Sequence, residues 1–170
     1  MTQELALAAS RPTASADIDG EYRYTLSRVW DETLPMAVFV MLNPSKADAQ
    51  LDDPTIRKCI GFARALGYGG IIVVNLFALR ATDPKELRKH PFPVGPRNAA
   101  AIDEVVRKHG PTGIVICAWG SNVAAKTRAP LVLARLRAMG VQLCALRISK
   151  KSQCPEHPLY LPYELKPVAM

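Results

Sequence analysis

Four short, largely apolar runs recur along this chain, and each of them ends abruptly at polar residues or at a turn signal. Apolar runs of this length without regular polar alternation are typical of strands buried on both faces, as in a parallel sheet. The runs cover residues 36–42, 71–74, 113–118 and 141–148. Segments with helical signals lie between them. The sequence therefore predicts an α/β fold, a three-layer α/β/α domain with a central four-stranded parallel sheet and right-handed crossovers.

Helix signals occupy the gaps between the predicted strands. Asp53 is a good N-cap and Pro54 suits the first helical position, so a helix is expected to begin there. In a later helix, Pro130 is expected to cause a kink or a break. The expected helices cover residues 54–66, a short stretch from about 82, 97–109 and 122–139.

The ends of the chain carry weaker signals. Residues 1–19 are rich in Ala, Ser and Thr and are expected to form a flexible tail, which leaves a single α/β domain over 20–170. Residues 21–30 alternate apolar and polar side chains, as an edge strand does. Four prolines interrupt 149–170, which is expected to be a loop.

Composition narrows the class of protein and of partner. Apolar residues make up 49% of the 170 residues, as in a globular chain. The formal charge of +7 favours polyanions such as nucleic acid, nucleotides or anionic lipid, although many soluble proteins are basic for no binding reason. No apolar run approaches the length of a membrane span, and residues 1–16 lack the basic start of a signal peptide. A cytoplasmic protein without a membrane partner is expected.

The four cysteines form no C-x-x-C pair, which favours a reducing compartment. Cys154 and His157 have the spacing of half a metal site, but no second pair of ligands accompanies them. No metal site and no cofactor are therefore expected.

In open parallel sheets, ligands bind outside the carboxyl ends of the strands. The segments that follow the four strands should therefore line one crevice. Each segment alone can be explained as a turn or as a structural amide, but their joint placement favours a site. They are 43–45 (Asn-Pro-Ser), 75–77 (Asn-Leu-Phe), 119–121 (Trp-Gly-Ser) and 149–157.

Four motifs, in this order, resemble those of the uracil-DNA glycosylase superfamily: MLNPS with Asn43, VVNLF with Asn75, AWGSNVAAK with Trp119, and HPLYL with His157. The chain also resembles an uncharacterised bacterial and phage family, a domain of unknown function, marked by MLNPS, DDPTIR, NLFALRATDP and HPLYL. The first resemblance implies a uracil-DNA glycosylase-like fold and a DNA-repair hydrolase that flips a damaged or modified base out of DNA and cleaves its N-glycosidic bond.

The resemblance also implies roles for individual residues. Asn43 would position the hydrolytic water, and because asparagine is a poor proton acceptor, a loop carboxylate would assist it. Asp48 is the main candidate; Asp52 is another, while Asp53 is better explained as a helix cap. His157 would stabilise the oxygen of the departing base. The base itself would be bound by Asn75, Ser45, Phe77 and Trp119.

Contacts to the nucleic acid follow from the same resemblance. Leu161 would fill the gap left by the flipped base. Phosphates would be contacted by Lys46, Arg147, Lys150 and Lys151. Ser45 replaces the tyrosine that excludes bulky bases in the strict uracil enzymes, which implies a roomier pocket, and the chain lacks the cysteine set of the iron–sulfur branches.

Two other functions fit the same sequence features. The first is a nucleotide- or nucleoside-processing enzyme that uses the same base pocket, with Arg80 and the acidic stretch 48–53 serving a phosphate or a metal ion. The second is a non-catalytic nucleic-acid-binding domain. Salt-dependent DNA affinity and release of free base would separate these functions.

Overall fold

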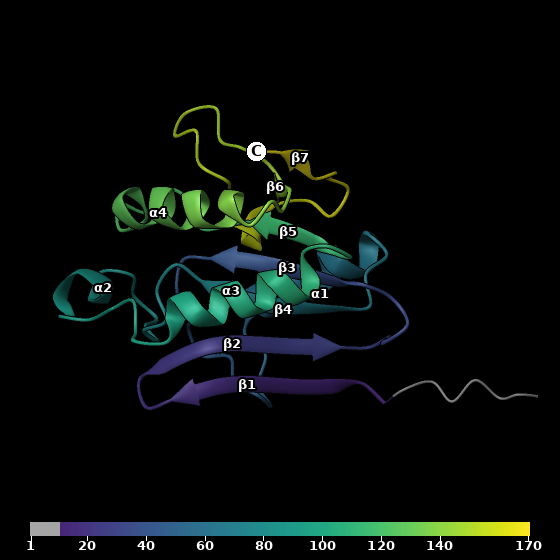
Figure 1. The fold of residues 1–170 in the computed structure, drawn as a ribbon, viewed down its shortest axis with the longest axis horizontal. Coiled ribbons are helices and arrows are strands. Elements are labelled where there is room, and N and C mark those ends of the chain that lie inside the picture. Colours follow the sequence, from purple (N-terminus) through teal and green to yellow (C-terminus); the bar gives the residue numbers. More distant parts are fainter. Residues whose placement is uncertain (1–10) are drawn as a thin grey trace, which may run out of the picture.

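A computed structural model describes residues 11–170 as a mixed α/β fold built on one seven-stranded sheet. The strands are β1 (Thr13–Asp19), β2 (Tyr22–Val29), β3 (Met36–Met41), β4 (Gly70–Asn75), β5 (Ile114–Cys117), β6 (Leu143–Ala145) and β7 (Val168–Ala169). The helices are α1 (Pro54–Ala65), α2 (Glu86–Lys89), α3 (Asn98–His109) and α4 (Ala125–Ala138), with a 3₁₀ turn η1 (Pro158–Tyr160). The strand order is β1-β2-β4-β3-β5-β6-β7, and Figure 1 shows β1 and β7 at opposite edges.

The centre of the sheet is parallel, as the apolar runs predict. β3 pairs in parallel with β4 and with β5, and β5 pairs in parallel with β6. The sheet is larger than the four parallel strands and one edge strand that the sequence predicts, because β1, β2 and β7 extend it by antiparallel pairing. β7 lies inside the stretch 149–170, which was expected to be a loop.

The N-terminal prediction needs a second correction. Part of the expected tail forms β1, which pairs with β2 over its full length; residues 1–10 lie outside the described part of the chain. β2 is therefore an inner strand, between β1 and β4, and not an edge strand. The side chains of β1 are mostly exposed, so hydrogen bonds along its backbone hold it in place without an apolar pattern that the sequence could reveal.

The two faces of the sheet form separate cores, so the predicted three layers are present. Along β3, Val38 and Val40 pack with α3 and α4, whereas Phe39 packs with Phe62 of α1 on the other face. This alternation follows from the two-residue period of a strand. Phe39 and Phe62 are fully buried, and removing either ring would cost about 3–5 kcal/mol of stability.

The helix ends are set by local chemistry. Asp53 caps α1 as predicted: its Oδ1 accepts a hydrogen bond from the backbone N–H of Ile56 at 2.9 Å, and Pro54 takes the first helical position. α4 runs through Pro130 without a break. It begins later than expected because Asn122 Oδ1 accepts from the N–H of Ala124 in a turn that precedes the helix.

No helix within residues 11–170 is long and apolar enough to cross a membrane.

Candidate functional site

A pocket of about 220 Å³ lies at the carboxyl ends of the parallel strands, where residues of both cores reach it. Its apolar wall comes from Met41, Leu42, Ile56, Val73 and Trp119, and its polar wall from Arg23, Asn43, Ser45, Asp53, Thr55, Asn75, Thr82 and His157. The expected convergence of the four strand ends is thus confirmed, since all four segments contribute a residue. The functional roles of these residues remain predictions.

Asn75 is the most unusual residue of the pocket. It ends β4 and is only 1% exposed, yet neither Nδ2 nor Oδ1 has a hydrogen-bond partner within residues 11–170. Its backbone carbonyl accepts a hydrogen bond from Nδ2 of Asn98 at 2.9 Å, so the main chain at this point is held firmly. A buried amide without partners costs free energy, and most buried polar groups are paired. Such an amide is suited to a ligand that supplies the missing partners.

Asn43, by contrast, is oriented by the protein. Its Nδ2 donates to the carbonyls of Pro44 at 2.9 Å and Ala81 at 2.8 Å. The N–H of Ala81 in turn donates to the carbonyl of Pro44, so the loops after β3 and β4 are tied together at the pocket. Because both amide hydrogens are used, Oδ1 is left as the group with which Asn43 can hold a ligand or a water.

Arg23 and Asp53 bring opposite charges to the pocket wall. Arg23 extends from β2, is 2% exposed, and donates from Nη1 to the carbonyl of Ala47 at 2.9 Å. Burial lowers its pKa to about 10, and the charge of Asp53 opposes that shift. Asp53 is the one acidic residue among those that line the pocket. Besides capping α1, it accepts a long hydrogen bond on Oδ2, 3.4 Å from the N–H of Ala47.

His157 comes from the C-terminal segment, which a glycine turn brings to the pocket. Gly120 has φ +76°, a conformation that favours glycine, and its N–H donates to the carbonyl of Pro155 at 2.9 Å. Nδ1 of His157 accepts from the N–H of Leu159 at 3.2 Å at the start of η1. In the neutral ring this places the proton on Nε2, which becomes a hydrogen-bond donor. Burial lowers the pKa of His157, although Asp53 opposes this effect.

The lowered pKa of His157 predicts a pH dependence. Since folding favours the neutral ring, its contribution to stability should be complete above about pH 6.5, the ordinary histidine value, and should be lost as the pH falls through the lower folded value. When the ring takes up a second proton, that proton is on Nδ1, so Nδ1 can no longer accept the hydrogen bond from the N–H of Leu159. We expect the melting temperature to decrease below pH 6.5. His157→Asn, whose side-chain oxygen can accept the same hydrogen bond in place of Nδ1, should reduce that decrease.

Thermal unfolding between pH 4.5 and 7.5 measures this effect. His109→Asn is the comparison variant: burial also lowers the pKa of His109, at the far end of α3, so each variant should remove only its own part of the decrease and the double variant should remove both parts. An unchanged pH dependence in His157→Asn would contradict the assignment.

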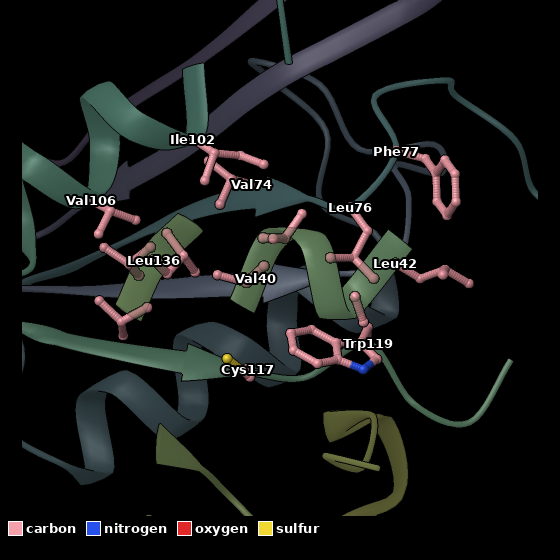
Figure 2. Close-up of a cluster of buried hydrophobic side chains, with 14 of the residues drawn as sticks. Val40, Leu42, Val74, Leu76, Phe77, Ile102, Val106, Cys117, Trp119 and Leu136 are labelled. Atoms are coloured by element: carbon pink, nitrogen blue, oxygen red, sulfur yellow. The ribbon is translucent and has the colours of Figure 1, made fainter. Parts of the chain in front are cut away.

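Several residues expected at the site lie elsewhere. Asp48 is outside the pocket lining; its Oδ1 accepts from the N–H groups of Gln50 and Leu51 at 2.8 Å, and these hydrogen bonds lower its pKa. Phe77 packs in the core under α3 and α4, and Figure 2 shows its ring at the margin of that core. Leu161 is 3% exposed within the α1-side core, so it is not free to enter a duplex, whereas Tyr160 beside it is 91% exposed.

The expected basic residues divide into two groups. Lys46, Lys150 and Lys151 are exposed and are free of ion pairs with residues 11–170. Arg147 forms an ion pair with Glu156 at 2.7 Å. Arg147 lines a shallow groove of about 290 Å³ that shares His157 with the pocket and is bordered by the loop 149–153.

Sequence reasoning missed Arg23 and Asn98. Arg23 lies in a strand that was expected at the edge, where an arginine would normally be solvated. Asn98 directly follows the predicted start of a helix and so resembles a surface residue. Asp53 was visible in the DDPTIR motif, but it was assigned only the role of a helix cap.

Comparison with known proteins places the chain in a family. No curated protein and no solved structure matches it significantly. The family described as "Protein of unknown function (DUF1643)" matches residues 23–159. This range begins at Arg23, includes His157 and contains every residue that lines the pocket. The chain therefore belongs to the DUF1643 family of proteins of unknown function.

Proposed function

We propose that this protein recognises a single nucleobase in DNA and hydrolyses its N-glycosidic bond, in the manner of the uracil-DNA glycosylase superfamily. The observation that carries the proposal is the amide of Asn75, which is buried in the pocket wall and has no hydrogen-bond partner among residues 11–170. An amide carries donors and an acceptor side by side, as the edge of a base does.

The size of the pocket supports a base as the group that enters it. A cavity of about 150 Å³ holds one benzene ring. The pocket, at about 220 Å³, has room for a larger planar ring. We place the sugar and the phosphates outside it, along the groove that shares His157 with the pocket.

Residues around the pocket supply the groups that hydrolysis requires. As the C1′–N bond breaks, its electron pair leaves with the base, and a water molecule forms the new bond to C1′. Nε2–H of His157 would donate to the base as negative charge develops on it. Asn43 would orient the water through Oδ1, and the carboxylate of Asp53, in place of Asp48, would accept the proton that the water loses. That proton would then return to the released base or pass to the solvent.

Single-turnover assays with oligonucleotides test the proposal. Strands that contain uracil, hypoxanthine, xanthine or an alkylated base are incubated with the protein and scored for abasic sites. We expect one class of base to be released by the wild-type chain. Salt-dependent binding without any release would indicate a binding domain, and hydrolysis of a free nucleotide would indicate a nucleotide-processing enzyme.

Exposed lysines in the loop that borders the neighbouring groove predict salt-dependent binding to DNA. Replacing both Lys150 and Lys151 with glutamine should weaken binding and should reduce the slope of log K against log salt by about 1.4–1.8, since each phosphate contact contributes about 0.7–0.9. Fluorescence anisotropy between 50 and 200 mM salt measures the slope. Replacing Arg107 and Lys108 with glutamine, in the last turn of α3, is the charge-matched control and should leave the slope unchanged. Equal effects of the two double variants would indicate non-specific attraction only.

A further inference from the structure

The pocket contains a charged donor that the proposed reaction does not use. Arg23 is 2% exposed and lies in the pocket wall. Its Nη1 donates to the carbonyl of Ala47, which leaves the other edge of the guanidinium, formed by Nε and Nη2. Nε has no hydrogen-bond partner within residues 11–170. A buried charged group with an unused donor is costly unless an acceptor is supplied, and a bound ligand can supply one.

Two residues of the polar wall, Arg23 and His157, present donors to the pocket. Arg23 can only donate, and the neutral tautomer of His157 donates from Nε2. Asp53 is an acceptor, but its Oδ1 already accepts from the N–H of Ile56. Asn75 offers both a donor and an acceptor and has no partner for either in the described residues. The ligand must therefore present acceptors to Arg23 while it matches an amide at Asn75.

Among bases, one class meets both conditions. The amide of Asn75 alone does not discriminate between bases. If its side chain flips by half a turn, the amide pairs either with an edge that carries a carbonyl and an N–H or with an edge that carries an amino group and a ring nitrogen. A guanidinium does discriminate: its two N–H groups match the O6 and N7 acceptors of a 6-oxopurine. Adenine would present its N6 amino donor to the same edge, and oxo-pyrimidines have no N7. The room beyond one benzene ring is consistent with a bicyclic base.

We infer that the pocket takes a 6-oxopurine, with O6 and N7 on the Nε edge of Arg23 and the N1–H edge on Asn75. This inference rests on the proposed function, because it specifies which base enters the proposed site. Arg23 is thereby a specificity-determining residue, and its charge would also favour the developing negative charge on O6.

Equilibrium binding to a series of single-stranded oligonucleotides tests the inference. The strands differ at one 2′-fluoroarabino nucleotide, whose fluorine slows glycosidic cleavage. That nucleotide carries hypoxanthine, 7-deazahypoxanthine, adenine or uracil. We expect the hypoxanthine strand to bind best and the loss of N7 in the deaza base to weaken binding about tenfold, the effect of one hydrogen bond to a charged donor. The 6-amino group of adenine should weaken binding at least as much.

Arg23→Lys removes the bidentate guanidinium donor but retains the positive charge. In this variant, the affinity for the hypoxanthine strand divided by the affinity for the 7-deazahypoxanthine strand should fall from about ten to about one. Arg97→Lys is the matched control; Arg97 pairs with Asp17 at 3.0 Å on the α3 side and lies outside the pocket lining. It should keep the wild-type ratio.

The outcomes separate this inference from the proposed function. If uracil or adenine binds as well as hypoxanthine, or if removing N7 has no effect, the inference is overturned while base recognition stands. If all four strands bind like an unmodified strand and no base is released in the single-turnover assays, the proposed function fails as well. The wild-type series alone decides between these results, so poor folding of Arg23→Lys would not leave the inference untested.

Discussion

Asn75→Leu is expected to stabilise the protein and at the same time to remove base recognition. Leucine has nearly the shape of asparagine and needs no hydrogen bonds, so the cost of burying an amide that has no partner in the described part of the chain disappears. The gain should be about 1–3 kcal/mol, which corresponds to a rise in melting temperature of about 2–12 °C for a chain of this size. Thermal unfolding monitored by circular dichroism measures it.

Loss of the amide should reduce base release about 100-fold in single-turnover assays, because two hydrogen bonds to the base are worth about 3 kcal/mol together. Gln142→Leu is the matched control. Gln142 is exposed and lies at the amino end of β6, whereas the pocket lies at the carboxyl ends of the parallel strands. Neither stability nor activity should therefore change much. If Asn75→Leu were less stable than the wild type, Asn75 would be a structural amide whose partners form within the protein, and the main support for the proposed function would be lost.

The central strands could be predicted because burial on both faces leaves a clear mark on a sequence. β3 and β4 were predicted to within a residue, and the helix cap at Asp53 was predicted correctly. β1 could not be predicted, since its exposed Ser, Thr and Asp side chains carry no apolar pattern. β7 is two residues long and is fixed by pairing with β6, a contact between distant parts of the chain.

The pocket could be predicted in outline for a different reason. The topology of a parallel sheet brings all strand ends to one edge, so residues such as Asn43 and Asn75 had to meet. Arg23 reaches the same place from an antiparallel strand, and no rule about parallel strand ends applies to it. Asp48 and Leu161 were chosen by loop position and motif spacing, which do not determine whether a side chain is buried or already bonded.

The two roles of Asp53 can be separated by one substitution. Asparagine caps a helix as well as aspartate does, so Asp53→Asn should preserve the cap of α1, and any decrease in melting temperature should reflect the lost charge beside the buried Arg23. It removes the carboxylate that we propose accepts a proton from the attacking water. Base release should therefore decrease by about 10²–10⁴-fold in single-turnover assays, the usual contribution of a general base.

Neighbouring carboxylates provide the controls for Asp53→Asn. Asp52→Asn weakens the ion pair with Arg28, in which Nε and Oδ1 are 2.8 Å apart, and should lower the melting temperature while base release remains. Asp48→Asn alters a turn outside the pocket lining and should also retain activity. Full activity in Asp53→Asn together with a large loss in Asp48→Asn would show that the loop rearranges on binding and that Asp48 is the general base. Full activity in all three variants would mean that no carboxylate of this loop takes part, and that Asn43 alone positions the water.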